Sequence, residues 1–202
     1  MESSLNYASL ETALTKMVTE LRGNNIEFFA FFGTLLGLIR EGKPIETDDD
    51  VDFYVNVSDY ENVKSVLRCL NFEIDYTMIP NHTKCFIQAT GFLMEEFVRI
   101  DFYFFDKDVD PHFLIERWNF PGTPQNPKSI LKVPKPLIFP LREISFGDVS
   151  IPIPKYPEII CEFLYGVNWT TPQQKKTDYH TLMLGGRPIR YRKDNGSIKL
   201  ID

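Results

Sequence analysis

Five carboxylates crowd into one short part of the chain, where Asp48, Asp49, Asp50 and Asp52 follow closely on Glu46. In an extended strand, alternate residues point to the same side and stand roughly 6.5 Å apart, so Asp48, Asp50 and Asp52 would share one face. Like charges on one face repel, and converging carboxylates are usually held by a hard divalent ion such as Mg²⁺ or Mn²⁺. The spacing therefore predicts a metal site. The alternative is a solvated acidic loop with only its last residue or two in the strand.

A further carboxylate, Asp101, interrupts the apolar segment FVRIDFYFF at 97–105. An unpaired charge in a central strand is costly, so Asp101 requires a partner. Arg99 lies two residues away on the same strand face and would supply a structural ion pair. We favour the alternative, in which this strand lies beside that of Asp50 and Asp52, about 4.8 Å away, so that the three carboxylates enclose one or two metal ions.

The elements that must position these residues follow from periodicity. Apolar residues recur at helical spacing before Gly23 and predict an amphipathic opening helix. The segment IEFFAFF at 26–32 predicts a buried strand that Gly33 ends. Thr34 stands where its side chain would cap a short helix through Ile39.

A second strand is expected over DDDVDFYV at 48–55, because β-branched and aromatic residues follow the carboxylates. Ser58 and Glu61 form a capping-box pattern ahead of the predicted helix DYENVKSVLRCL at 59–70. Three more strands are expected at 73–79, 84–90 and 97–105, the first two separated by a turn at Pro80 and Asn81.

The rest of the chain is predicted to be loop-rich. Pro, Asn and Lys between Asp106 and Pro136 indicate long surface loops, with one short helix around HFLIERW at 112–118. A hairpin turning at Gly147 and a helix that Pro157 starts and Gly166 closes are expected next, before a polar tail. We expect a single domain over residues 1–202 of the α+β class, with a mixed β-sheet flanked by helices.

The net charge, the distribution of apolar residues and the cysteine spacing argue against several classes of protein. A net charge of −6 and a pI near 5.2 disfavour a protein that binds the phosphate backbone of nucleic acids. No apolar run reaches transmembrane length, and the N-terminus lacks the apolar core of a signal peptide. We expect a cytoplasmic protein as the sequence stands, or a Golgi or endoplasmic-reticulum lumenal one if it is part of a longer secretory protein. Cys69, Cys85 and Cys161 fit reduced core thiols better than disulfides or a zinc site.

These residues resemble a known family. The order of an apolar strand, Gly33-Thr34, a helix, Asp50-Val51-Asp52 and a later strand with Asp101 is similar to the nucleotidyltransferase fold of the DNA polymerase β type. The longer string, which joins GTLLG at 33–37 to REG at 40–42, Ile45 and DDDVD at 48–52, looks specifically like the LicD family. That family includes bacterial phosphocholine transferases and the fukutin-related proteins. Tyr165-Gly166, Trp169 and Pro172 resemble its C-terminal motif, so the resemblance covers residues 27–176.

The resemblance implies a metal-dependent transfer of a phospho-alcohol, such as phosphocholine or ribitol phosphate, from a CDP-activated donor to a sugar or glycan hydroxyl. Asp50, Asp52 and Asp101 would be its catalytic, metal-binding residues, with Mg²⁺ or Mn²⁺ as cofactor. Glu46-Thr47 replaces the Pro-Trp pair that members often carry, and Val167-Asn168 replaces an acidic residue after the motif glycine. A nucleotidyltransferase acting on a small acceptor and a non-catalytic binding module of the same fold are the alternatives.

Five further residues are candidates for substrate binding. Gly33 would let the backbone approach the donor phosphates, and Thr34 would hydrogen-bond them from a helix N-terminus. Arg40 would neutralise a phosphate, or be a solvated arginine at a helix end. Trp169 would stack on a base or a choline group, or belong to the core. Lys175 would reach the donor, or be a surface lysine.

Overall fold

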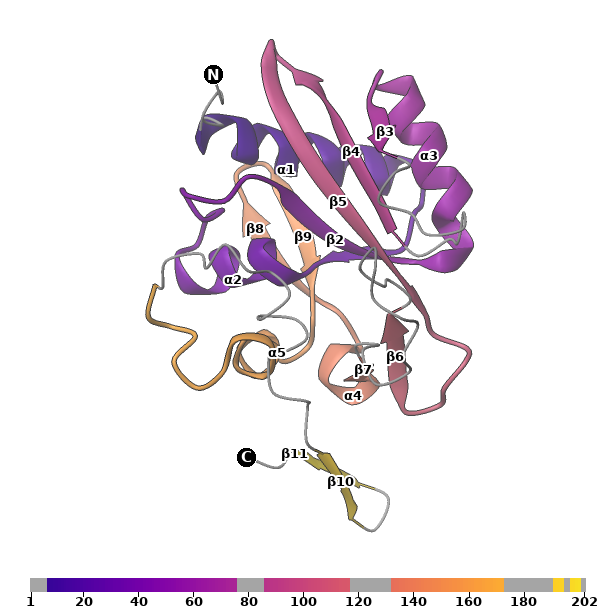
Figure 1. Cartoon of the computed structure of the whole chain (residues 1–202), viewed down its shortest axis with the longest axis vertical. Helices are drawn as coiled ribbons and strands as arrows, with labels where there is room; N and C mark the ends of the chain where they lie inside the picture. The colour runs from indigo at the N-terminus through magenta and orange to yellow at the C-terminus, as the bar shows by residue number, and fades with distance from the viewer. Residues whose placement is uncertain (1–6, 76–85, 117–131, 173–190, 195–196, 201–202) are drawn as a thin grey trace.

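The computed structural model describes residues 7–75, 86–116, 132–172, 191–194 and 197–200. Its centre is a mixed sheet with the strand order β1-β2-β5-β4-β3, flanked by helices (Figure 1), which confirms the predicted α+β fold. The central pair β2–β5 is parallel, whereas β1–β2, β4–β5 and β3–β4 are antiparallel. The five strands are β1 (Phe28–Ala30), β2 (Val51–Asn56), β5 (Glu96–Asp106), β4 (Phe86–Leu93) and β3 (Glu73–Asp75).

Aromatic side chains fill both faces of the sheet. On one face, Phe53 and Phe102 stack with ring centroids 5.7 Å apart, and Tyr60 of α3 (Tyr60–Cys69) contacts Phe104. The opening helix α1 (Tyr7–Gly23) packs beside α3 and against β2, β4 and β5, as its apolar periodicity predicts. On the other face, Phe32 of α2 (Phe32–Arg40) packs on Tyr103.

The strand at β1 is shorter than predicted, because α2 begins at Phe32. Thr34 therefore lies inside the helix, and the prediction that it caps α2 is wrong: its hydroxyl instead accepts the backbone N–H of Asp52. The strand β2 begins at Val51, so Asp48 is not on a strand face.

The start of α3 also differs from the prediction. A 3₁₀ turn, η1 (Val57–Asp59), precedes the helix, and the Asn56 side chain accepts the Ser58 backbone N–H at 3.1 Å. The predicted capping box at Ser58 is therefore wrong, since a residue at the end of β2 caps the chain first.

The described part of the helix predicted around residues 112–118 is a strand. β6 (Phe113–Glu116) pairs with the end of β5 and with β7 (Lys132–Pro134), so backbone pairing at a free edge outweighs the local helical pattern. A short helix, α4 (Lys135–Ile138), follows. The predicted turn at Pro80 and Asn81 lies outside the described residues.

The predicted hairpin at Gly147 and the predicted helix between Pro157 and Gly166 are both present, whereas the hairpin in the tail was not predicted. β8 (Arg142–Phe146) and β9 (Val149–Ile153) form the predicted hairpin, with Gly147 at a φ of +54°. The helix α5 (Pro157–Tyr165) has Pro157 in its first turn and ends at Gly166 with a φ of +86°. β9 packs on α1 and β1, and α5 packs on α2. A separate hairpin joins β10 (Tyr191–Asp194) to β11 (Ser197–Leu200).

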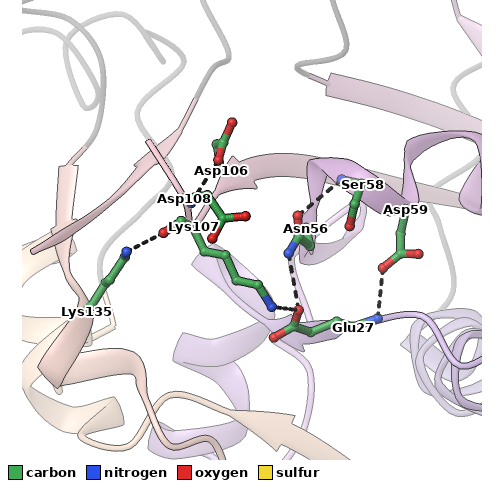
Figure 2. A network of polar contacts seen from close by, with 8 residues as sticks. All are labelled: Glu27, Asn56, Ser58, Asp59, Asp106, Lys107, Asp108 and Lys135. Carbon is green, nitrogen blue, oxygen red and sulfur yellow. Dashed lines mark hydrogen bonds and ion pairs between the residues drawn. The ribbon is translucent and has the colours of Figure 1, made fainter. Parts of the chain in front are cut away.

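A polar network ties β1 to the ends of β2 and β5 (Figure 2). Glu27 accepts hydrogen bonds from Asn56 at 3.2 Å and Lys107 at 2.6 Å, and its backbone N–H donates to Asp59 at 3.3 Å. Lys135 of α4 donates to the carbonyl oxygen of Lys107. The Glu27–Lys107 pair is part-exposed and contributes about 1 kcal/mol at most, so the network mainly sets how the strand ends meet.

No helix in the described ranges combines the length and the apolar character needed to cross a membrane.

The approach of α2 to the loop before β2 predicts a strong effect of Gly37→Ala. A β-carbon on Gly37 would lie 2.6 Å from the Lys43 carbonyl oxygen and 2.9 Å from the Ile45 nitrogen, and backbone atoms cannot move away cheaply. We expect Gly37→Ala to lower the free energy of unfolding by about 1–3 kcal/mol. Gly23→Ala is the matched control, because nothing lies within 4 Å of its β-carbon position. Urea unfolding followed by circular dichroism measures both, and equal stability of the two variants would contradict the packing argument.

Candidate metal centre

Two buried carboxylates lie side by side at the centre of the sheet. Asp52 and Asp101 are direct partners in the parallel β2–β5 pair, and each residue is only 5% exposed. The register that places them together is the one that stacks Phe53 on Phe102 across the same two strands. Because side chains alternate between the two faces, the core contact on one face fixes the carboxylate pair on the other.

Asp50 joins this pair from the coil that precedes β2. One carboxylate oxygen from each of Asp50, Asp52 and Asp101 lies within 4.8 Å of the others. The prediction that the strands of Asp52 and Asp101 lie side by side is therefore confirmed, whereas the prediction that Asp50 shares the strand of Asp52 is wrong. The half-buried coil holds a second acidic group, in which one carboxylate oxygen from each residue lies within 4.8 Å of the others. Its members are Asp48, Asp49 and Asp50.

The donor atoms fit a hard divalent cation. All three side chains offer carboxylate oxygens, the ligands that Mg²⁺ and Mn²⁺ prefer, and two of them are buried in the sheet. Burying like charges together is unfavourable without a cation to offset them. The residues Asp50, Asp52 and Asp101 would hold such an ion.

The first turn of α2 makes two hydrogen bonds with Asp52. The Gly33 backbone N–H donates to Asp52 Oδ2 at 2.9 Å, and the Thr34 hydroxyl accepts the Asp52 backbone N–H at 2.8 Å. A β-carbon on residue 33 would lie 2.4 Å from Asp48 Oδ2 and 3.2 Å from Asp52 Oδ2, so only glycine fits here without displacing a carboxylate. Phe32 has a φ of +43°, in the left-handed region, where the chain turns sharply from β1 into α2.

Gln88 orients Asp101 from the neighbouring strand. It lies directly opposite Asp101 in the β4–β5 pair, and its amide nitrogen donates to both carboxylate oxygens, at 3.1 Å and 3.4 Å. No pattern in the sequence marks Gln88 as a residue of this site. Its signal is visible only once the register of β4 against β5 is known, since 13 residues separate the two side chains.

Arg99 forms an ion pair with Asp49, whereas the less favoured interpretation of the sequence paired it with Asp101. Its guanidinium Nη1 donates to Asp49 Oδ2 at 2.7 Å. The structural ion pair considered for Asp101 therefore forms with the acidic loop. This contact brings the coil before β2 onto β5, near the carboxylate pair.

Burial raises the pKa of Asp52 well above its ordinary value of 3.8. The negative charges of Asp50, Asp48 and Asp101 raise this pKa further, and hydrogen bonding to the α2 backbone partly opposes the shift. A proton on Asp52, or a cation beside it, therefore stabilises the folded state.

The other candidates occupy different settings. Arg40 pairs with the adjacent Glu41 at 2.5 Å, and its side chain is 11% exposed. Trp169 is half-buried and packs against the core, in line with the core alternative. Lys175 lies outside the described residues.

Cys161 is a buried free thiol, as predicted, and burial raises its pKa to about 12. Cys69 is a free thiol but is exposed, so the prediction that it belongs to the core is wrong. Cys85 lies outside the described residues.

A family model described as the LicD/FKTN/FKRP nucleotidyltransferase domain matches residues 25–156, the part of the chain that holds every carboxylate of this centre. The chain belongs to this family. No curated protein matches the sequence significantly.

One of the solved structures similar to this LicD-family chain shares its fold with a TM-score above 0.5. The lincosamide antibiotic adenylyltransferase LnuA, bound to lincomycin, matches with a TM-score of 0.52 and 14% identity, over 71% of this chain and 79% of its own. The antibiotic-resistance factor ANT(2'')-Ia matches with a TM-score of 0.47 and 12% identity, over 88% of this chain and 82% of its own.

The raised pKa of Asp52 predicts that Asp52→Asn stabilises the metal-free protein at neutral pH. The folded state holds the Asp52 proton more tightly than the unfolded chain does, so this residue favours folding at low pH. That contribution is lost as the pH rises from 3.8 through the folded-state pKa. A gain of 1 kcal/mol raises the melting temperature of a protein of this size by roughly 2–4 °C, and we expect an increase of at least this order.

Thermal unfolding in EDTA, recorded from acidic to neutral pH, measures the difference between Asp52→Asn and wild type. The difference should shrink toward pH 4, where wild-type Asp52 holds its proton. A variant that is less stable than wild type at neutral pH would show that the buried charge is already compensated.

Proposed function

We propose that this protein is a metal-dependent phosphotransferase that moves a phospho-alcohol, of the phosphocholine or ribitol-phosphate type, from a CDP-activated donor to a sugar or glycan hydroxyl. The observation that carries the proposal is the convergence of Asp50, Asp52 and Asp101 in a chain of the LicD family. Transfer of a phosphorus-containing group needs positioning and neutralisation of charge, with little covalent chemistry from the protein.

The three carboxylates have different roles in the proposed reaction. A bound Mg²⁺ or Mn²⁺ would supply the positive charge that neutralises the donor pyrophosphate. Asp50 and Asp52 would hold the ion, Asp101 would complete the site, and the α2 backbone keeps the Asp52 carboxylate in place. Asp101, oriented by Gln88, accepts the proton of the attacking hydroxyl. The hydroxyl oxygen forms a bond to the transferred phosphorus, the bond from that phosphorus to the CMP oxygen breaks, and CMP leaves.

Substrate contacts are proposed for five residues. Gly33 and Thr34 lie in the first turn of α2 and already contact Asp52, so donor phosphates at the metal would meet the same helix N-terminus. Arg40, Trp169 and Lys175 are proposed to contact the rest of the donor, with Trp169 stacking on the base or on a quaternary ammonium group.

A nucleotidyltransferase is the second candidate. LnuA, which shares the fold, is an adenylyltransferase, and the same three carboxylates would serve the transfer of a nucleoside monophosphate to a small hydroxyl acceptor. The released product separates the two reactions, because the first releases CMP and the second releases pyrophosphate from a nucleoside triphosphate.

The metal role predicts that Asp50→Asn, Asp52→Asn and Asp101→Asn each lower turnover by a factor of about 10³ or more, since each removes several kcal/mol of charge stabilisation. Asp148→Asn is the control, because Asp148 is an exposed carboxylate in the β8–β9 turn. The assay mixes the protein with Mn²⁺, a CDP-alcohol and a glycan acceptor and measures CMP. Wild-type activity in Asp52→Asn would rule out the metal role.

Binding is tested separately by titrating Mn²⁺ into the protein by calorimetry, with and without CDP. We expect Mn²⁺ to bind more tightly with CDP and to lose binding in Asp50→Asn. Absence of Mn²⁺ binding to the wild type would favour a non-catalytic member of the family.

A further inference from the structure

Asp50 is held differently from the two carboxylates beside it. Asp52 and Asp101 are fixed by the ladder between β2 and β5, in which they are direct partners. Asp50 precedes β2 and lies in coil, where no strand pairing sets its position. Its place beside the other two carboxylates therefore depends on contacts of the coil itself.

The contact next to Asp50 joins the coil to the strand of Asp101. Asp49 Oδ2 accepts a hydrogen bond from Arg99 Nη1 at 2.7 Å, across 50 residues of sequence. Arg99 stands two residues before Asp101 on β5, so both side chains point to the same side of the sheet. The ion pair thus fastens the residue beside Asp50 to the face that carries the buried carboxylates.

The Asp49–Arg99 pair contributes little to the stability of the fold. Its side chains are 43% and 32% exposed, and ion pairs with this much exposure stabilise proteins only slightly. The Arg99 Nε atom is buried and has no hydrogen-bond partner among the residues that the structure describes. An unsatisfied buried donor destabilises the folded state by more than a partly exposed ion pair stabilises it. The balance indicates that the pair serves the placement of its neighbours.

We infer that Arg99 is a positioning residue, which holds Asp50 beside Asp52 and Asp101 through its ion pair with Asp49. The inference rests on the proposed function only for the reaction that this positioning would serve. The holding of the coil is a property of the protein without metal, so it can be tested independently of activity.

Positioning and simple charge make opposite predictions for metal affinity. Removal of a cation from an acidic cluster makes the cluster more negative, so charge alone would strengthen Mn²⁺ binding in Arg99→Met. Loss of positioning would weaken it, since changes in residues that orient metal ligands cost about 10- to 100-fold in affinity. The sign of the change therefore distinguishes the two roles.

The first experiment is hydrogen exchange by mass spectrometry in EDTA, on peptides that cover residues 46–52. Arg99→Met and Asp49→Asn should each speed exchange in this segment several-fold, because each breaks the ion pair from one side. Arg99→Lys should exchange like wild type, since the pair uses a single nitrogen. Arg22→Met is the control, because it breaks the ion pair to Glu143 between α1 and β8. Neither element carries a carboxylate of the metal centre. Unchanged exchange in both disrupting variants would overturn the inference.

The second experiment is Mn²⁺ titration of the same variants. We expect Arg99→Met and Asp49→Asn to bind at least about tenfold more weakly than wild type, Arg99→Lys to recover most of the loss, and Arg22→Met to bind normally. Equal or tighter binding in Arg99→Met would overturn the inference. If the wild type binds no Mn²⁺, the proposed function fails, whereas the exchange data still decide whether Arg99 holds the coil.

Discussion

The burial of two carboxylates side by side in the parallel β2–β5 pair is the constraint on which the rest of the structure depends. Asp52 and Asp101 are partners in the ladder, and their neighbours Phe53 and Phe102 stack on the opposite face. A slip of one residue would turn the carboxylates into the aromatic core and the rings toward the site. The aromatic packing that selects this register therefore also places the two carboxylates side by side. A change of register would alter both the core and the acidic centre.

The junction between β1 and α2 shows how local strain serves this centre. Phe32 adopts a left-handed φ of +43°, which is unfavourable for a bulky residue, and Gly33 follows with its N–H directed at Asp52. A straight continuation of the strand would carry this N–H away. The aromatic contacts of Phe32 with Tyr54 and Tyr103 hold the turn in place, so core packing sustains the strain.

Much of the fold and the central part of the site could be predicted from the sequence, because both leave local patterns. Asp101 inside an apolar strand is such a pattern, since a buried charge without a partner is too costly to be accidental. Helix periodicity placed α1, and Pro157 and Gly166 marked both ends of α5. Each of these signals is contained in a few neighbouring residues.

Two of the failed predictions share a physical cause, which is competition from distant backbone. Thr34 has the residue type of a helix cap, but the nearby Asp52 backbone N–H claims its hydroxyl. Phe113–Glu116 has a helical pattern, but the edge of β5 offers strand pairing. Gln88 carries no local signal at all, because its role comes from lying opposite Asp101.

Charge repulsion explains why the acidic run does not form one strand face. A strand that included Asp48 and Asp50 would align three charges with Asp101 in the sheet, and repulsion in a region of low dielectric would oppose it. Ending β2 at Val51 keeps only Asp52 in the ladder and leaves Asp50 in coil. The centre thus combines two carboxylates that the strand ladder fixes with one carboxylate from the coil, so the position of Asp50 is set separately from the core register.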